Sequence, residues 1–158
     1  VVMSSEIETF VYELRDYVRD NFNTYLSAIN AEEGDGMTVE EVKEANIDVM
    51  DLDPFSHNEY PIIDIYPTDV EVGHLAMGSD ELGIRCTALI ALNKGATSLA
   101  SKKIMRYIEA FRQALRDAGE AAWDVDPDEA VTIAVYPSAE TEIKIASIAW
   151  RTIKDIGV

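Results

Sequence analysis

Apolar side chains recur at spacings of three and four residues near the start of the chain, which predicts a long amphipathic helix. The apolar stripe consists of Ile7, Phe10, Val11, Leu14, Val18, Tyr25 and Ile29. The opposite, polar face carries Asp16, Arg19, Asp20 and Asn23. Ser4 or Ser5 can cap the first turn, and the helix should end before Gly34 and Gly36, which permit a positive φ.

A second, shorter helix is expected directly afterwards. Thr38 and Glu41 have the spacing of a capping box, in which each side chain satisfies the other residue's backbone N–H. This helix should end near Ala45-Asn46. The stretch from Ile47 to Asn58 is interpreted as an irregular connection with a short strand at Ile47–Met50.

Two β-rich runs follow. Tyr60–Pro67 combines β-branched residues with a proline near each end, which places the prolines at strand termini or on a sheet edge. From Leu82 the chain alternates, and one face carries Leu82, Ile84, Cys86, Ala88, Ile90 and Leu92. Arg85, Thr87 and Asn93 point the other way. The acidic stretch Thr68–Glu81 between the runs should form a hairpin loop or a mobile tongue.

A third helix is expected from a cap at Thr97 or Ser98 to about Ala118, with Gly119 as the residue that ends it. Its apolar stripe is Ala100, Ile104, Tyr107, Ile108, Phe111 and Leu115, and its polar side carries Lys102, Arg106 and Arg116. Asp124–Asp128 then forms an acidic turn. Two closing strands follow, near Ala130–Tyr136 and Thr141–Ile153.

This order of elements predicts a single α+β domain over residues 1–158. The 14 residues of Thr68–Glu81, together with the closing hairpin, favour an antiparallel or mixed sheet over a parallel one. The two long amphipathic helices should pack on one face of that sheet.

The charge of the chain is unusual. Thirty acidic and thirteen basic residues give a formal net charge of −17. Such a surface repels duplex DNA, so sequence-specific DNA reading is not expected, whereas an acidic wall lets DNA slide past. Composition alone favours the plainer explanation, that the acidity serves solubility or tolerance of high salt.

We expect neither a membrane span nor a secretion signal. No apolar run approaches the length of a membrane span, and the first residues shown, Val1 to Glu6, include no basic region and no apolar core. Cys86, the one cysteine, excludes an internal disulfide and fits a reducing cytoplasm.

No catalytic or cofactor motif is present: the chain lacks a phosphate-binding loop, a dinucleotide fingerprint, a nucleophile elbow and paired zinc cysteines. Cys86 could act as a nucleophile only if His57 or His74 approached it, and its place on an apolar strand face favours a buried structural role. We therefore expect neither an enzyme nor a cofactor.

Two acidic groups could in principle hold a cation. Asp124, Asp126 and Asp128 have the spacing that opens an EF-hand loop, but glutamate replaces the required glycine and valine the final glutamate. The other group, for which a solvated turn is the ordinary interpretation, consists of Asp51, Asp53, His57 and Glu59. No metal site is expected from either.

Large aromatic side chains lie near the ends of the expected elements: Tyr66, Trp123 and Trp150. Each can close the core, or serve as an anchor between subunits, where aromatics are enriched. The final strand is apolar in both phases, with Ile143 and Ile145 followed by Ile148 and Trp150. Such a strand is buried on both faces, is bulged, or presents one side to a partner.

Several segments, taken in their order along the chain, resemble the tail terminator (tail completion) proteins of tailed bacteriophages. The resemblance covers the leading helix, an acidic connection with Pro54-Phe55, the strand Tyr60–Pro67, the strand end Leu92–Gly95, the helix Ser101–Arg112 and two closing strands. It implies a virion protein, assembled in the host cytoplasm, that forms a ring, usually hexameric. The ring would cap the tail tube, join it to the head completion or neck protein, and let DNA pass through its lumen.

By the same resemblance, Thr68–Glu81 would project toward a neighbouring subunit or the tube. The residues expected at that interface are Tyr66, Asp69, Glu71, His74, Met77 and Trp150. The alternatives are another head–tail neck or adaptor protein, and a small acidic ligand-binding or regulatory domain. An enzyme that uses Cys86 or an acid pair without a familiar motif is a third alternative.

Overall fold

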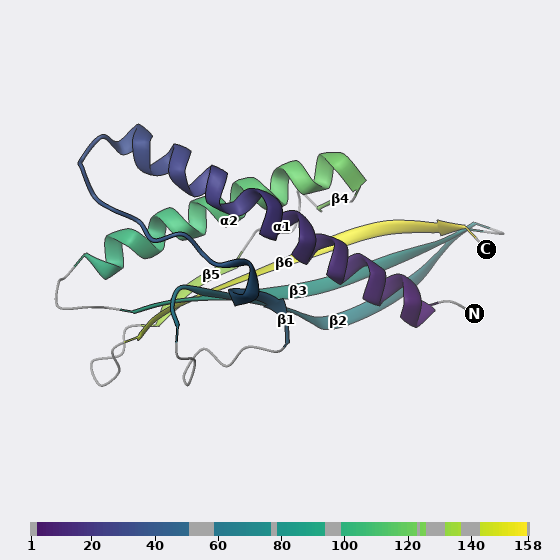
Figure 1. The fold of residues 1–158 in the computed structure, drawn as a ribbon. Helices are drawn as coiled ribbons and strands as arrows, with labels where there is room; N and C mark the ends of the chain where they lie inside the picture. The colour runs from purple at the N-terminus through teal and green to yellow at the C-terminus, as the bar shows by residue number, and fades with distance from the viewer. Residues whose placement is uncertain are drawn as a thin grey trace.

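The computed structural model describes residues 3–50, 59–76, 79–93, 99–122, 124–125, 132–136 and 143–157. It confirms an α+β fold (Figure 1). The elements are α1 (Met3–Glu33), the 3₁₀ turn η1 (Glu44–Asn46), β1 (Ile47–Val49), β2 (Ile62–Ala76), β3 (Ser79–Asn93), α2 (Ala100–Ala122), β4 (Asp124–Val125), β5 (Thr132–Tyr136) and β6 (Ile143–Gly157).

The strands form one six-stranded mixed sheet. Its order is β1-β2-β3-β6-β4, and β5 also pairs with β6. β1 is parallel to β2, and all other pairs are antiparallel. β3 lies at the centre and pairs along its length with β2 on one side and β6 on the other, so that Cys86 is opposite both Pro67 and Trp150.

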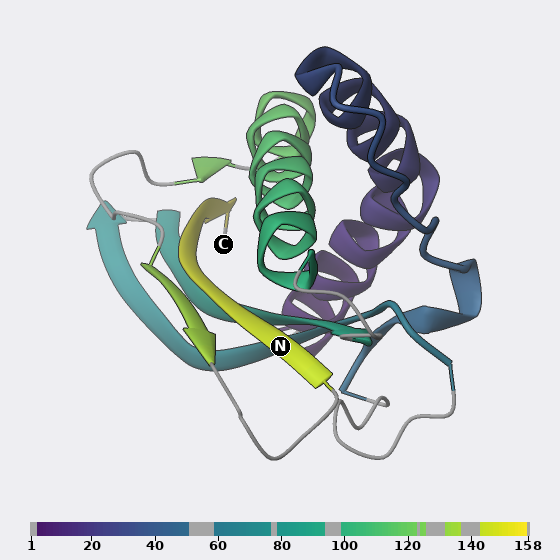
Figure 2. The same cartoon turned by 90° about the vertical axis from the view of Figure 1, so that its left-hand side faces the viewer.

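The main core lies between the helices and the sheet. α1 and α2 contact each other, and each contacts strands of the sheet. Figure 2 shows the two helices side by side over the curved strands. The alternation from Leu82 to Leu92 is confirmed, since all six residues of that set belong to this core. The apolar stripe expected for α2 is also buried.

The buried stripe of α1 differs in detail from the expected one. Phe22 and Leu26 are fully buried, whereas Tyr25 is only partly buried. The Tyr25 hydroxyl instead donates a hydrogen bond to Asp117 of α2 and lies 3.2 Å from the Tyr17 hydroxyl. After Val18 the buried stripe continues in steps of four residues, through Phe22 and Leu26. Tyr25 lies beside this stripe, where its hydroxyl links α1 to α2.

The second helix expected at Thr38 is wrong. Residues 36–43 have no regular secondary structure, and only Glu44–Asn46 makes a helical turn. We call residues 34–43 the strap. The Asn23 side chain donates to the Val42 carbonyl and accepts from the Val42 N–H, both at 2.9 Å, while the Val42 side chain is buried. These contacts join residues that are far apart in the sequence, and they outweigh the local preference for a capped helix.

Two expectations for α2 are also wrong. The helix continues through Gly119 to Ala122, and Arg106 does not lie on a solvated side. The Arg106 side chain is only 5% exposed and forms an ion pair with Asp35 of the strap. Gly34 and Gly36 have positive φ angles of 59° and 75° on either side of Asp35, a turn that glycine adopts without strain.

The stretch Thr68–Glu81 is a hairpin, but it is not a loop. β2 continues to Ala76 and β3 begins at Ser79, with a register shift between Pro67 and Asp69. Met77 and Gly78 lie outside the described residues. The short strand after Ala45-Asn46 and the two closing strands are confirmed, whereas Asp124 begins the short strand β4 rather than a turn.

The Asp35–Arg106 pair should make stability depend on acid. Hydrogen bonds from Arg106 first, and then from Lys102, hold the pKa of Asp35 well below its ordinary value. A lowered folded-state pKa stabilises the fold above the unfolded pKa of about 4, and this contribution is lost as the pH falls further. We expect Asp35→Asn to unfold at lower urea concentration than the wild type at pH 7, with the difference shrinking below about pH 4.

Urea unfolding followed by circular dichroism from neutral pH to about pH 3 measures this difference. Glu41→Gln is the matched control, because it removes one negative charge from an exposed strap residue. A difference between Asp35→Asn and the wild type that stays constant throughout the range would contradict the assignment.

Candidate subunit interface

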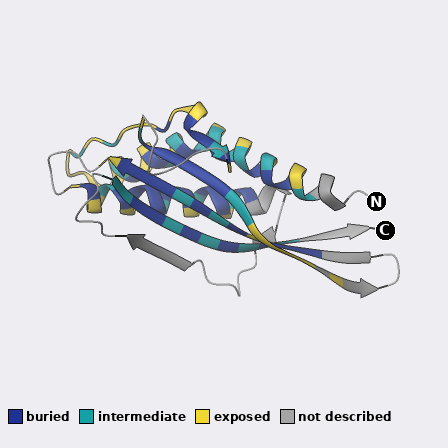
Figure 3. Ribbon diagram, turned by 90° about the horizontal axis from the view of Figure 1, so that it is seen from below, coloured by how far each residue is buried: buried dark blue, intermediate teal, exposed yellow. Residues whose placement is uncertain are grey.

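Alternate positions of the long strands form a second sheet face, outside the helix-packed core. We call it the outer face. It includes Ile62, Asp64, Tyr66, Asp69 and Glu71 of β2 together with their register partners on β3 and β6. Figure 3 shows buried and partly exposed positions alternating along these strands when the sheet is viewed from below.

One end of the outer face is apolar. Ile62, Ala91 and Ile145 are in register across β2, β3 and β6, and they form a small buried cluster. Tyr60 and Ile143 pack against this cluster and are themselves partly buried. The outer face therefore has a second hydrophobic cluster, which is buried within the molecule and separate from the main core.

The other end of the outer face is charged. Asp69, Arg85 and Arg151 are in register across the three strands, so the two arginines lie directly opposite each other. Arg151 bends along the sheet to Glu71, where Nη2 lies 3.4 Å from a carboxylate oxygen. Its guanidinium lies over Gly83, and a Cβ at Gly83 would be 2.8 Å from Arg151 Nη2. Glycine at this position is what lets the guanidinium lie against the sheet.

The structure brings part of the expected interface set together. Tyr66 is partly buried, whereas Asp69 and Glu71 are exposed on the outer face. His74 lies in β2 opposite Asp80, and the expectation for Met77 falls outside the described residues. The alternation pattern had already set Arg85 apart from the apolar face, but Gly83 and Arg151 carried no signal until the register aligned them.

Trp150 requires a correction. Its side chain is 3% exposed and packs against Phe111 of α2, with ring centroids 5.5 Å apart. It faces the core because Trp150 is opposite Cys86, which lies on the helix side of β3. Trp150 closes the core and is not available as an anchor between subunits.

The geometry also argues against a nucleophilic Cys86. The thiol is buried, and burial raises its pKa to about 12. Cys86 is opposite Pro67, so His74 lies seven positions further along β2, roughly 20 Å away along the strand. His57 lies outside the described residues. A buried thiol of high pKa is an inert core residue rather than a nucleophile.

The two acidic groups are only partly described. Asp124 lies in β4 opposite Ile153, while Asp126 and Asp128 fall outside the described residues, as do Asp51 and Asp53. Glu59 forms an exposed ion pair with Lys43 at 3.0 Å. In the part of the chain that the structure describes, no three His, Cys, Asp or Glu side chains are grouped closely enough to hold a metal ion.

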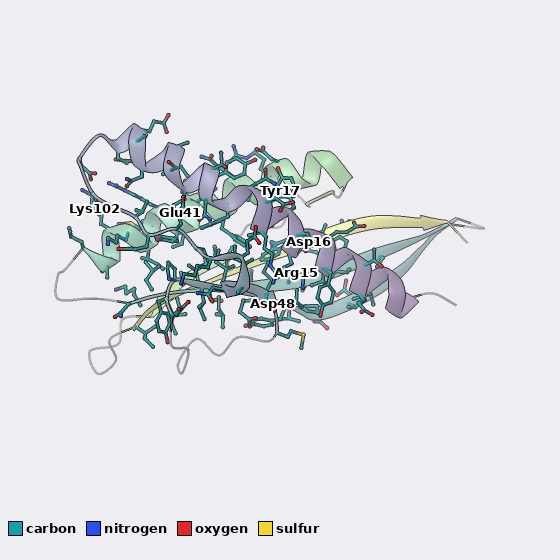
Figure 4. All side chains as sticks on the ribbon, viewed as in Figure 1. Arg15, Asp16, Tyr17, Glu41, Asp48 and Lys102 are labelled. Carbon is teal, nitrogen blue, oxygen red and sulfur yellow. The ribbon has the colours of Figure 1, made fainter. Side chains whose placement is uncertain are left out.

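Most of the described basic side chains are in ion pairs within the molecule. Figure 4 shows Arg15 and Asp48 close together where α1 meets β1; their side chains are 3.1 Å apart. Lys102 lies 2.8 Å from Asp35, and Arg106 pairs with the same carboxylate. The other paired basic residues are Arg19, Lys43, Lys103, Arg112 and Arg151.

No protein-family model matches this chain, and no curated protein matches it either. Neither of the long helices, within the residues described, is apolar enough over a sufficient length to cross a bilayer.

The buried state of Cys86 is directly testable. Because the raised pKa keeps the group as a thiol and the core excludes reagents, we expect Ellman's reagent at pH 8 to react at least about 100-fold more slowly with folded protein than with protein in urea. The control is Ala31→Cys, which adds an exposed thiol on α1 and should react at once with one equivalent. Rapid labelling of the folded wild type would show that the thiol is accessible and reopen the nucleophile hypothesis.

Proposed function

We propose that this protein is a structural virion subunit, similar to the tail terminator proteins of tailed bacteriophages. Copies of the chain close into a ring, hexameric by the resemblance, that caps the tail tube and joins it to the head completion or neck protein. DNA passes through the lumen without being held. The ring is assembled in the host cytoplasm and has no catalytic role.

The observation that carries the proposal is the outer face. In this proposal both helices cover one face of the sheet, which leaves the other face for partners. That second face carries the exposed Asp69 and Glu71, with Arg85 and Arg151 in register beside Asp69, whereas its apolar cluster at Ile62, Ala91 and Ile145 is buried within the molecule. Exposed polar and charged groups, arginine among them, are typical of the rim of a protein–protein interface.

The charge distribution supports the passage of DNA. Because most of the described basic side chains are already paired with carboxylates, few remain to replace the counterions of DNA phosphates. An acidic surface of this kind binds DNA weakly at any salt concentration. It suits the wall of a conduit better than a DNA-binding domain.

The described surface offers little support for a ligand-binding domain. A shallow groove runs between α1 and the strap, lined by residues such as Asn23, Leu26, Asn30 and Met37. The Asn23 and Asn30 side chains already bond the strap backbone at Val42 and Met37. Their polar groups hold the strap in place instead of facing a ligand.

The ring proposal predicts a salt-dependent mass. Each copy carries a net charge of −17, so copies repel one another at low salt, and screening weakens this repulsion. We expect light scattering to show mostly monomer at about 0.05 M salt and a closed species of about six chains at about 2 M. A monomer at every salt and protein concentration would contradict self-assembly.

A further inference from the structure

The described edges of the sheet are unequally protected. On β1, the Arg19 Nε of α1 donates to the Ile47 carbonyl at 2.7 Å, so a helix side chain already occupies that edge. β1 pairs only with residues 63–65 of β2. Among the described residues, no strand pairs with the outer side of β2 from Thr68 to Ala76, or with the outer side of β5.

The free edge of β2 is partly blocked. Pro67 lacks an N–H, and the register shift at Thr68 places one extra residue in the strand, where the Thr68 hydroxyl donates to the Arg85 carbonyl at 3.2 Å. Beyond the shift, Asp69 and Glu71 are exposed. Proline, a bulge and charge are the devices that prevent unwanted pairing along an edge, so this edge accepts only a compatible strand.

β5 lacks these devices. Its sequence, Thr132–Tyr136, contains no charged residue, proline or glycine and is rich in β-branched residues. An edge strand with this composition is a ready template for another strand. Because β5 belongs to a chain with thirty acidic residues, its lack of charge is notable.

We propose that β5 of one copy pairs with the free edge of β2 in the next copy, with Ala134 opposite the segment from Glu71 to Gly73. This inference rests on the proposed ring and names its subunit contact. Such pairing is head-to-tail, because β2 and β5 are different surfaces on opposite sides of the sheet. A head-to-tail contact closes a ring when the rotation between copies is a simple fraction of a turn.

The strand directions fit this pairing. β2 and β6 run antiparallel to β3, and β5 runs antiparallel to β6. β5 is therefore antiparallel to β2 of its own copy. When two copies meet head-to-tail in the same orientation, β5 also runs antiparallel to the neighbour's β2, so the alternation continues across the contact.

Charge selects this pairing over the symmetric one. If β2 paired with β2 of a second copy, the exposed carboxylates of Asp69 and Glu71 would approach their own counterparts, and like charges opposite each other are destabilising. The uncharged β5 presents no such carboxylates. The acidic edge of β2 therefore disfavours pairing with the β2 edge of another copy and favours pairing with β5.

Cysteine cross-linking tests the contact and its register. Ala134→Cys is mixed with Gly73→Cys or, separately, with Glu71→Cys, at the salt concentration that gives assembly, and the mixture is oxidised mildly. A side chain at Gly73 meets nothing within 4 Å, so that variant should fold normally. The wild type, with buried Cys86, and Ala134→Cys mixed with Ala31→Cys are the matched controls.

We expect disulfide dimers in at least one of the two mixtures of Ala134→Cys with a β2 variant, and none in Ala134→Cys alone or in the controls. Dimers of Ala134→Cys with itself would overturn the head-to-tail contact in favour of a two-fold one. Assembly without any cross-link would overturn this contact but leave the ring proposal intact. Failure to assemble under any condition would overturn both.

Charge variants at the same position give a second readout. Ala134→Lys should assemble more tightly than Ala134→Glu, by roughly fivefold per contact, because position 134 would face the carboxylates of the neighbouring β2. Ala31→Lys and Ala31→Glu, which change the net charge equally at an exposed position of α1, are the matched controls and should differ less. Equal assembly of the two variants would overturn the proposed contact.

Discussion

The full-length pairing of β3 with β2 and β6 is the constraint on which the rest of the structure depends. It fixes the register of three long strands at once, and a shift of one residue would turn every side chain to the opposite face. The apolar set from Leu82 to Leu92 then faces the helices, together with Ile148 and Trp150 of β6. The same register aligns Asp69, Arg85 and Arg151 on the outer face.

The helices are held in place by polar contacts as well as by apolar burial. Asn23 holds the strap at Val42, Arg106 holds it at Asp35, and the Tyr107 hydroxyl donates to the Glu40 carbonyl. Buried or partly buried polar groups of this kind must find partners, and each of these finds one on the strap. Through these contacts the strap holds α1 and α2 together. In the chain, the strap follows α1 and precedes η1 and β1.

The sequence predicted the elements whose signal is periodic. The stripes of the two long helices and the alternation in β3 follow from local spacing, and the structure bears them out apart from Phe22, Leu26 and Tyr25 of α1. Contacts between distant residues account for the failures. The helix expected from the capping box at Thr38 does not form, because Asn23 holds Val42 by hydrogen bonds. The ion pair that buries Arg106 joins residues 71 positions apart in the sequence. The acids and glycines of Thr68–Glu81 concealed the continuation of β2 and β3 into the hairpin. Charge is tolerated there in β2, because an edge strand can carry it on its exposed side.

The candidate interface was predictable only in part. Asp69 and Glu71 lie on the outer face, but Trp150 faces the core, since a strand apolar in both phases does not reveal which phase faces the helices. The contact between Arg151 and Gly83 is evident only from the strand register, which places the guanidinium over the glycine. Such pairings depend on the alignment of strands, which the spacing of one segment does not contain.

Electron cryomicroscopy of the assembled protein tests the central claim most directly. The account predicts closed rings with about sixfold symmetry, in which β5 of each copy lies antiparallel to β2 of the next. Two-fold dimers, or open filaments in which these strands do not meet, would contradict it.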